Sequence, residues 1–153
     1  TRKVMADKIP DEVASLLIPM VGRPMLLPNV AVAEIVPWEE PEKQDSAPEW
    51  FLGNVTWRGI NVPLVSLELM NDTDVDEAYS GHRIAVLNGV GSTKREFYAI
   101  SVQGLPRLIR VFGEEVSGDE PLSEPAYDMN VLVSGERAMI PDLDYVEKQI
   151  ESL

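Results

Sequence analysis

Apart from its many carboxylates, the sequence holds few side chains that could carry out chemistry. His82 is the single histidine, and there is no cysteine. A catalytic triad would have to use this histidine, yet no Gly-x-Ser-x-Gly nucleophile elbow accompanies it. One imidazole without a thiolate also falls short of a zinc site. The carboxylates could form an acid–base pair, but they gather in polar segments that are typical of solvated loops.

One acidic segment in the middle of the chain has carboxylates at a spacing that could bind calcium. Asp72, Asp74 and Asp76 reproduce the opening of an EF-hand loop. The match then ends, because Glu77 stands where the loop needs a glycine and Arg83 where it needs a bidentate glutamate. We therefore expect a solvated loop here and no bound metal.

The charge balance excludes several classes of partner. The formal net charge is −13, from 13 basic and 26 acidic side chains. Nucleic-acid binders usually carry a basic surface, so nucleic acid is not an expected partner. Anionic membrane surfaces are disfavoured for the same reason, and no apolar run approaches the roughly 18 residues of a membrane span. The stretch TRKVMADKIPDE, residues 1–12, lacks the apolar core of a signal peptide, so we expect a cytoplasmic protein.

The elements that must position the remaining residues are short strands. The stretch GNVTWRGINVPLVSL, residues 53–67, predicts two strands joined at Arg58 and Gly59. Trp57 falls on the core face of the first strand and Arg58 on the opposite face. Gly59 can adopt the positive φ that a tight turn often needs. Pro63 has no N–H to donate, so the second strand should lie at an edge or a bulge there.

The rest of the chain predicts more strands, two loops and one closing helix. Trp38 and Trp50 flank the first loop and are candidates for exposed interface aromatics. Many short strands separated by glycine and proline turns predict a mainly β, barrel-type protein. Strands are predicted from Ser15, up to Leu27, up to Val36 after a short turn or helix, and at 83–88, 96–102, 105–111, 129–133 and 137–141. Loops are predicted at 37–48 and 112–128, and Asp142 is predicted to cap a helix with the apolar stripe Leu143, Val146, Ile150 and Leu153.

The hairpin closely resembles the central motif of CheW-like domains, which runs roughly G-x-x-x-L-R-G-x-x-V-P-x-x-D-L. These domains are adaptors of bacterial chemosensory arrays. Upstream, residues 33–36 resemble the V-x-E-I segment of the family, and the downstream strands and the helix start follow in the order of the family. The resemblance covers about Ser15 to Ile150. The acidic, proline-rich loop most resembles the ChpC-type members, which serve type IV pilus chemosensory systems and twitching motility.

This resemblance implies two intertwined five-stranded, SH3-like β-barrels with a C-terminal helix, over residues 15–153, after an N-terminal extension at residues 1–14. It also implies a non-enzymatic scaffold without a cofactor or metal. The expected partners are the regulatory domain of a CheA-type histidine kinase and the cytoplasmic hairpin tip of a chemoreceptor, which enters a groove between the barrels. The protein is then expected in the cytoplasm, associated with receptor arrays at the inner membrane, without inserting into it. It is expected to be a monomer when isolated.

Individual residues can be carried over by position from the family motif. Glu34 and Arg58 match a glutamate and an arginine that pair beside the receptor groove. The apolar positions that line this groove are matched by Val32, Ile35 and Val36, and the structural motif is matched by Trp57, Gly59, Val62 and Pro63.

Two positions depart from the motif. Ser66 stands where the family usually has aspartate, and Trp57 stands where it usually has leucine. A divergent adaptor, with a restricted set of receptors or without kinase contact, is therefore left open. An alternative function is a small β-barrel that binds a ligand or performs carboxylate-based hydrolysis. Such a protein would need an enclosed pocket that holds close acids with raised pKa values.

Overall fold

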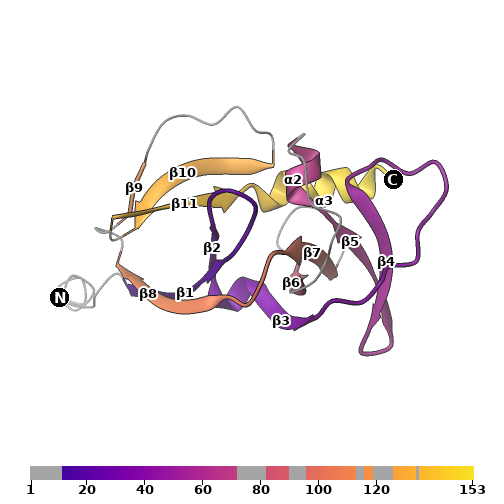
Figure 1. Ribbon diagram of the computed structural model, residues 1–153, viewed down its shortest axis with the longest axis horizontal. Coiled ribbons are helices and arrows are strands. Elements are labelled where there is room, and N and C mark those ends of the chain that lie inside the picture. The colour runs from indigo at the N-terminus through magenta and orange to yellow at the C-terminus, as the bar shows by residue number, and fades with distance from the viewer. Residues whose placement is uncertain (1–11, 72–81, 90–95, 113–115, 119–125, 134) are drawn as a thin grey trace, which may run out of the picture.

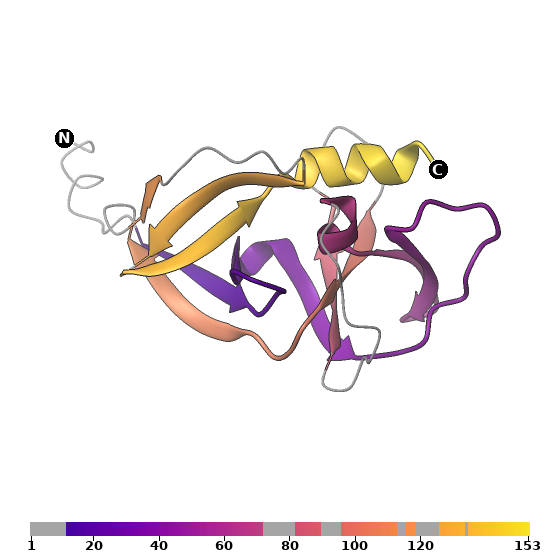
Figure 2. The ribbon, with the colours of Figure 1, turned by 45° about the horizontal axis from the view of Figure 1, so that its top comes forward.

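The computed structural model describes residues 12–71, 82–89, 96–112, 116–118, 126–133 and 135–153. Within these ranges the chain forms two β-sheets, a short helix α2 (Leu67–Met70) and the C-terminal helix α3 (Leu143–Glu151). The sheets lie side by side, and α3 extends over one of them (Figures 1 and 2). The segment with the partial calcium match lies outside the described residues, apart from His82 and Arg83.

One sheet has six strands and the other has five. The six-stranded sheet combines both ends of the chain, whereas the five-stranded sheet is built from the contiguous residues 32–102. The six strands, in spatial order, are β8 (Arg107–Phe112), β1 (Glu12–Ile18), β2 (Met25–Pro28), β11 (Glu136–Pro141), β10 (Tyr127–Val133) and β9 (Val116–Gly118). The five strands, in spatial order, are β3 (Val32–Pro37), β6 (Arg83–Asn88), β7 (Phe97–Val102), β5 (Ile60–Val65) and β4 (Phe51–Trp57).

The predicted fold class is confirmed: the chain is mainly β, its two sheets are intertwined, and it ends in a helix. The turn or helix predicted after Pro28 is the 3-10 helix η1 (Asn29–Ala31), and β6 has the predicted bounds. Strand β1 begins at Glu12, earlier than predicted, because its residues 12–17 pair with β8. Strand β9 lies within the predicted loop 112–128 and gives the first sheet a sixth strand.

The largest core cluster joins the two sheets and the C-terminal helix. It contains Met25 from the first sheet, Tyr98 from the second and Val146 from α3, each fully buried. Because these side chains bury one shared apolar surface, separating the two sheets would expose that surface to water. The two smaller clusters lie within the individual sheets.

The predicted helix cap is confirmed. The carboxylate of Asp142 accepts a hydrogen bond from the Tyr145 N–H at 3.0 Å, which satisfies one of the open donors at the start of α3. Val146 and Ile150 are buried as the apolar stripe predicts. The prediction for Leu153 was wrong: this side chain is half exposed, since the helix ends at Glu151.

The predicted loop at residues 37–48 is fixed to β4 by backbone hydrogen bonds. Glu42 and Asn54 exchange two such bonds, at 2.8 and 2.9 Å. Gly53 permits this approach. A Cβ at this position would lie 2.5 Å from the carbonyl oxygen of Glu42, and its φ of +135° is one that L side chains rarely adopt. The first glycine of the hairpin motif is therefore required by contact with this loop.

The prediction for Pro63 is met only locally, because β5 is an inner strand between β7 and β4. Pro63 lies opposite Asn54 on β4, while the parallel pairing of β5 with β7 includes only Leu64 and Val65. The missing N–H is therefore at a position where no β7 partner is present.

In the described ranges, no helix is long and apolar enough to cross a membrane.

Candidate functional site

Three side chains of the motif region meet at the end of the five-stranded sheet. Glu34 lies on β3, Trp57 is the last residue of β4, and Arg58 is the first residue of the turn that follows. The carboxylate oxygen Oε1 of Glu34 accepts the Trp57 Nε1–H at 2.9 Å. The same oxygen accepts hydrogen bonds from Arg58 Nε at 3.3 Å and Arg58 Nη2 at 3.2 Å. The expected pairing of Glu34 with Arg58 is therefore present in the structure.

The turn itself dictates where Arg58 stands. Arg58 and Gly59 have φ values of 50° and 77°, and they form the two-residue connection between β4 and β5. Positive φ at both central residues is the signature of a type I′ hairpin turn, in which asparagine and glycine are preferred. An arginine in this conformation is disfavoured on its own, so its presence here points to a use of the side chain.

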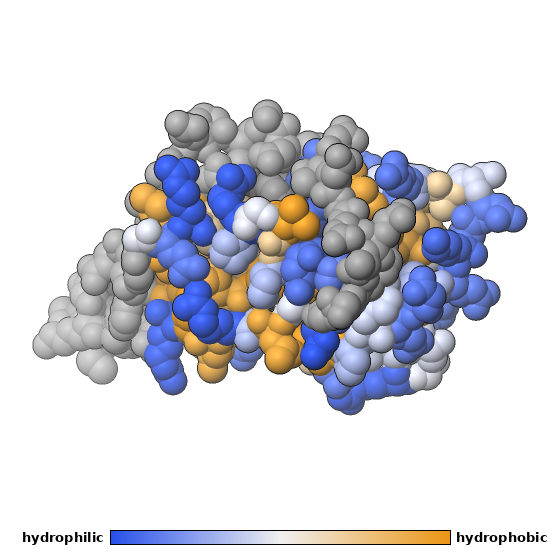
Figure 3. Space-filling model, in the orientation of Figure 1, coloured by the Kyte–Doolittle hydropathy of each residue, from blue (hydrophilic) through white to orange (hydrophobic). Residues whose placement is uncertain are grey.

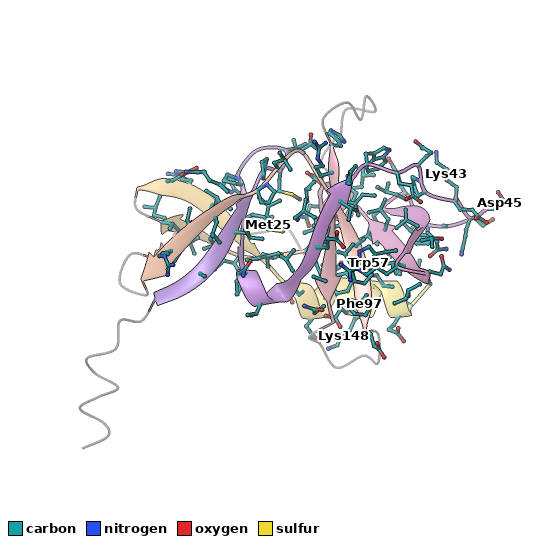
Figure 4. The ribbon with its side chains drawn as sticks, turned by 90° about the horizontal axis from the view of Figure 1, so that it is seen from below. Met25, Lys43, Asp45, Trp57, Phe97 and Lys148 are labelled. Atoms are coloured by element: carbon teal, nitrogen blue, oxygen red, sulfur yellow. The ribbon has the colours of Figure 1, made fainter. Side chains whose placement is uncertain are left out.

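The Arg58 guanidinium does not point away from Trp57 as the strand alternation suggested. Its Cζ atom lies 5.2 Å from the centroid of the Trp57 ring, at the distance of a cation–π contact. Trp57 also packs against Phe97, with ring centroids 5.0 Å apart and planes inclined by 60° (Figure 4). Trp57 is half-buried between these neighbours instead of lying fully in the core.

The cluster is charged but exposed. The Trp57 N–H and the Arg58 guanidinium lower the pKa of Glu34, so this carboxyl is ionised at neutral pH. The side chains of Arg58 and Glu34 are 69% and 40% exposed, and ion pairs at such exposure contribute little to stability. The pair is therefore better suited to recognising a partner than to holding the fold together.

The predicted apolar residues of β3 fall on two sides of the strand. Val36 lies beside the cluster, where it lines a cavity of about 350 Å³ together with Trp38, Val55, Trp57 and Ile84. Val32 and Ile35 instead pack against the central core and stay half-buried. A bulge between Val32 and Glu34 breaks the simple alternation of β3, which explains this division.

Several strongly exposed apolar side chains, among them Val30 and Leu108, were not singled out from the sequence. Val30 in η1 is 83% exposed and Leu108 on β8 is 64% exposed. Figure 3, in the orientation of Figure 1, shows apolar side chains over β8 and towards the start of β3. The alternation of β8, in which Ile109 and Val111 face the core, could have placed Leu108 on the outer face.

The sequence model of the CheW-like domain family matches residues 15–150. The chain belongs to the CheW-like domain family. No curated protein sequence matches it. Among solved structures it is similar to the scaffolding protein TtCheW from Thermoanaerobacter tengcongensis, with a TM-score of 0.76 and 16% sequence identity. That likeness covers 90% of this chain and 92% of the other, and it shows a shared fold.

The structure gives a physical reason for one departure from the CheW-like motif. Ser66 is the N-cap of α2, where its Oγ accepts the Leu69 N–H at 3.2 Å. Serine and aspartate are both good N-caps, so the local role is kept. Ser66 is only 2% exposed, so the change at this position lies beneath the surface that a partner would contact.

Proposed function

We propose that this CheW-like chain is a non-enzymatic adaptor that couples chemoreceptors to a CheA-type histidine kinase. Family membership across residues 15–150 supports this role, as does the likeness to a structure described as a scaffolding protein. The observation that carries the proposal is the exposed ion pair between Glu34 and Arg58. The pair includes the arginine of the family motif, and this Arg58 adopts an unfavourable positive φ in the turn.

The receptor surface of this proposal is centred on that pair. The hairpin tip of a chemoreceptor contacts Glu34, Arg58 and the neighbouring Val36, while Val32 and Ile35 shape the surface from beneath. The exposed Val30 and Leu108 extend the apolar area on either side of β1, since β1 pairs with both β2 and β8. Apolar contact then supplies affinity, and the charged pair selects the partner.

The remaining parts of the proposal follow the family. The CheW-like domain spans residues 15–153, with residues 1–14 as an extension. The regulatory domain of the kinase binds a surface separate from the Glu34–Arg58 pair, and the monomeric adaptor resides in cytoplasmic receptor arrays at the inner membrane. The acidic, proline-rich composition of the loop at residues 37–48 favours, within this proposal, a ChpC-type adaptor of a type IV pilus system that controls twitching motility.

The proposal is tested by titrating the full chain with a receptor cytoplasmic fragment and with the kinase regulatory domain from the same organism. We expect saturable binding of both. Arg58→Asn should weaken receptor binding by more than about tenfold, because buried interface arginines often dominate binding energy. Kinase binding should be unchanged.

Asparagine is well suited to the positive φ at position 58, so this variant should keep its free energy of unfolding within about 0.5 kcal/mol of the parent. A loss of receptor binding is then not a loss of fold. If Arg58→Asn binds the receptor fragment as tightly as the parent does, the assigned receptor surface is wrong. If the parent binds neither partner, the adaptor role is wrong.

A further inference from the structure

The five-stranded sheet is curled, and its two edge strands face each other across an opening. β3 and β4 stand at opposite ends of the strand order, and among the described residues no backbone ladder joins them. The cavity of about 350 Å³ opens between the ends of these two strands, where Val36 and Val55 contribute to its wall. Side chains therefore have to hold the two edges together at this end.

Trp57 provides the shortest of the bonds that cross this opening. Its Nε1–H to Glu34 Oε1 distance of 2.9 Å is shorter than either distance from Arg58 to the same oxygen. The indole also contacts Phe97 on one strand of the sheet and the Arg58 guanidinium at the rim. One side chain thus orients both members of the charged pair.

The hydrogen bonds within the cluster leave one acceptor and one donor for a partner. Oε1 of Glu34 accepts all three N–H groups, so that within the described part of the chain Oε2 of the same carboxylate is left as an acceptor and Nη1 of Arg58 as a donor. The side chains of Arg58 and Glu34, which carry these groups, are 69% and 40% exposed, so solvent and a partner can reach the pair. A leucine at position 57, as in the usual motif, has no N–H group and no ring to fix them.

We propose that Trp57 is a positioning residue for receptor recognition, which fixes Glu34 and Arg58 across the open edge of the sheet as a preset acceptor and donor. This inference rests on the proposed function, because it concerns the same receptor surface. It also assigns a role to the departure from leucine. Binding then requires little further ordering of the two charged side chains, which lowers the cost of association.

Two variants separate the hydrogen bond from the ring. Trp57→Phe removes the N–H but keeps an aromatic face for Arg58 and Phe97, whereas Trp57→Leu removes both. Each is titrated as the full chain with the receptor cytoplasmic fragment. We expect the Kd to rise about three- to tenfold for Trp57→Phe and at least as much for Trp57→Leu, which is the range for the loss of one hydrogen bond of ordinary net strength. Kinase-domain binding, measured in parallel, should not change.

A second readout tests positioning directly. The Trp57 hydrogen bond is the largest cause of the lowered pKa of Glu34, with Arg58 as the charged group facing it and Glu39 on the wall of the adjoining cavity. An NMR titration of the Glu34 carboxyl should therefore show a higher pKa in both variants than in the parent. The pH at which receptor binding is half lost should rise in the same direction, since binding needs the ionised carboxylate.

The outcomes distinguish this inference from the proposed function. A parent chain that fails to bind the receptor fragment overturns the proposed function and, with it, the role in recognition. If the parent binds and Trp57→Phe binds equally well with an unchanged Glu34 pKa, only the inference is overturned. Weaker receptor binding with a raised pKa and intact kinase binding supports it. Unfolding curves at neutral pH show which of the two variants is folded, and either one alone is sufficient.

Discussion

Gly53 shows how one residue of the motif is fixed by backbone packing. The space that a side chain would need is occupied by the Glu42 carbonyl of the loop before β4, and the φ of +135° excludes most other residues. Gly22 also has a positive φ, of +86°, yet nothing lies within 4 Å of where its Cβ would be. Both positions thus favour glycine because of their positive φ, but only at Gly53 would a side chain also clash with neighbouring atoms.

We predict that Gly53→Ala destabilises the protein by about 2–4 kcal/mol, from backbone strain together with overpacking. Gly22→Ala should cost only about 1 kcal/mol, because it meets strain alone. Urea unfolding of both variants measures the difference. Equal losses would show that contact with Glu42 does not matter.

At the same scale, the sequence predicted the pairing of the candidate site but not its geometry. Resemblance to the motif placed Glu34 beside Arg58, and the structure has that ion pair. Strand alternation placed Trp57 and Arg58 on opposite faces, and this was wrong because Arg58 lies in the turn, where alternation no longer applies. The Trp57–Glu34 hydrogen bond joins residues 23 positions apart, so no local pattern could predict it.

Among the elements, α2 is a single turn that organises buried polar groups. Its N-cap Ser66 has its Oγ 3.4 Å from Glu68 Oε1, and Glu68 is 1% exposed. Glu68 also accepts the Val21 N–H at 3.1 Å, which connects α2 to the segment between β1 and β2. An aspartate at position 66 would place a second carboxylate beside this buried one. The presence of Glu68 thus gives a physical reason for serine at the cap.

We predict that Ser66→Asp destabilises the protein, although aspartate is an equally good N-cap, because two carboxylates would share a buried site. The cost should be about 1–3 kcal/mol, and it should fall to near zero in the Glu68→Gln background. A double-mutant cycle of unfolding free energies measures this coupling. Additive effects of the two changes would contradict it.

The elements differed in how far the sequence predicted them. The hairpin of β4 and β5 and the helix α3 have strong local signals, a glycine turn and a capped apolar stripe, and both were found. Helix α2 was missed because four residues give no helical period. Strand β9 has three residues in an acidic stretch, so its pairing with β10 depends on the partner strand more than on its own sequence.

For the whole molecule, the predicted family implied the intertwined sheets, which local patterns could not have supplied. The parallel contact of β2 with β11 joins Met25 to Met139, and strand propensity carries no information about such a pairing.

The core also contains a buried acid, Glu68, whose protonation is coupled to folding. Burial raises the pKa of Glu68 above its ordinary value of 4.5, while His82 nearby and the Val21 N–H act in the opposite direction.

We predict that Glu68 makes the protein less stable as pH rises. With a raised pKa, the folded state binds a proton that the unfolded state has lost, so stability decreases from about pH 4.5 up to the folded-state pKa and is then constant. Glu68→Gln should remove this contribution while keeping an acceptor for Val21. Urea unfolding from pH 4.5 to 8 should show the variant gaining stability relative to the parent. A pH-independent difference would contradict this prediction.

The strand order of the six-stranded sheet also bears on synthesis. β1 and β2 leave the ribosome before their sheet partners β8 and β11, and β11 comes last of the strands in the described residues. The five-stranded sheet needs only residues 32–102, so it can assemble while translation continues. The apolar side chains of β1 and β2 then remain uncovered on the nascent chain until β8 and β11 have emerged and paired with them.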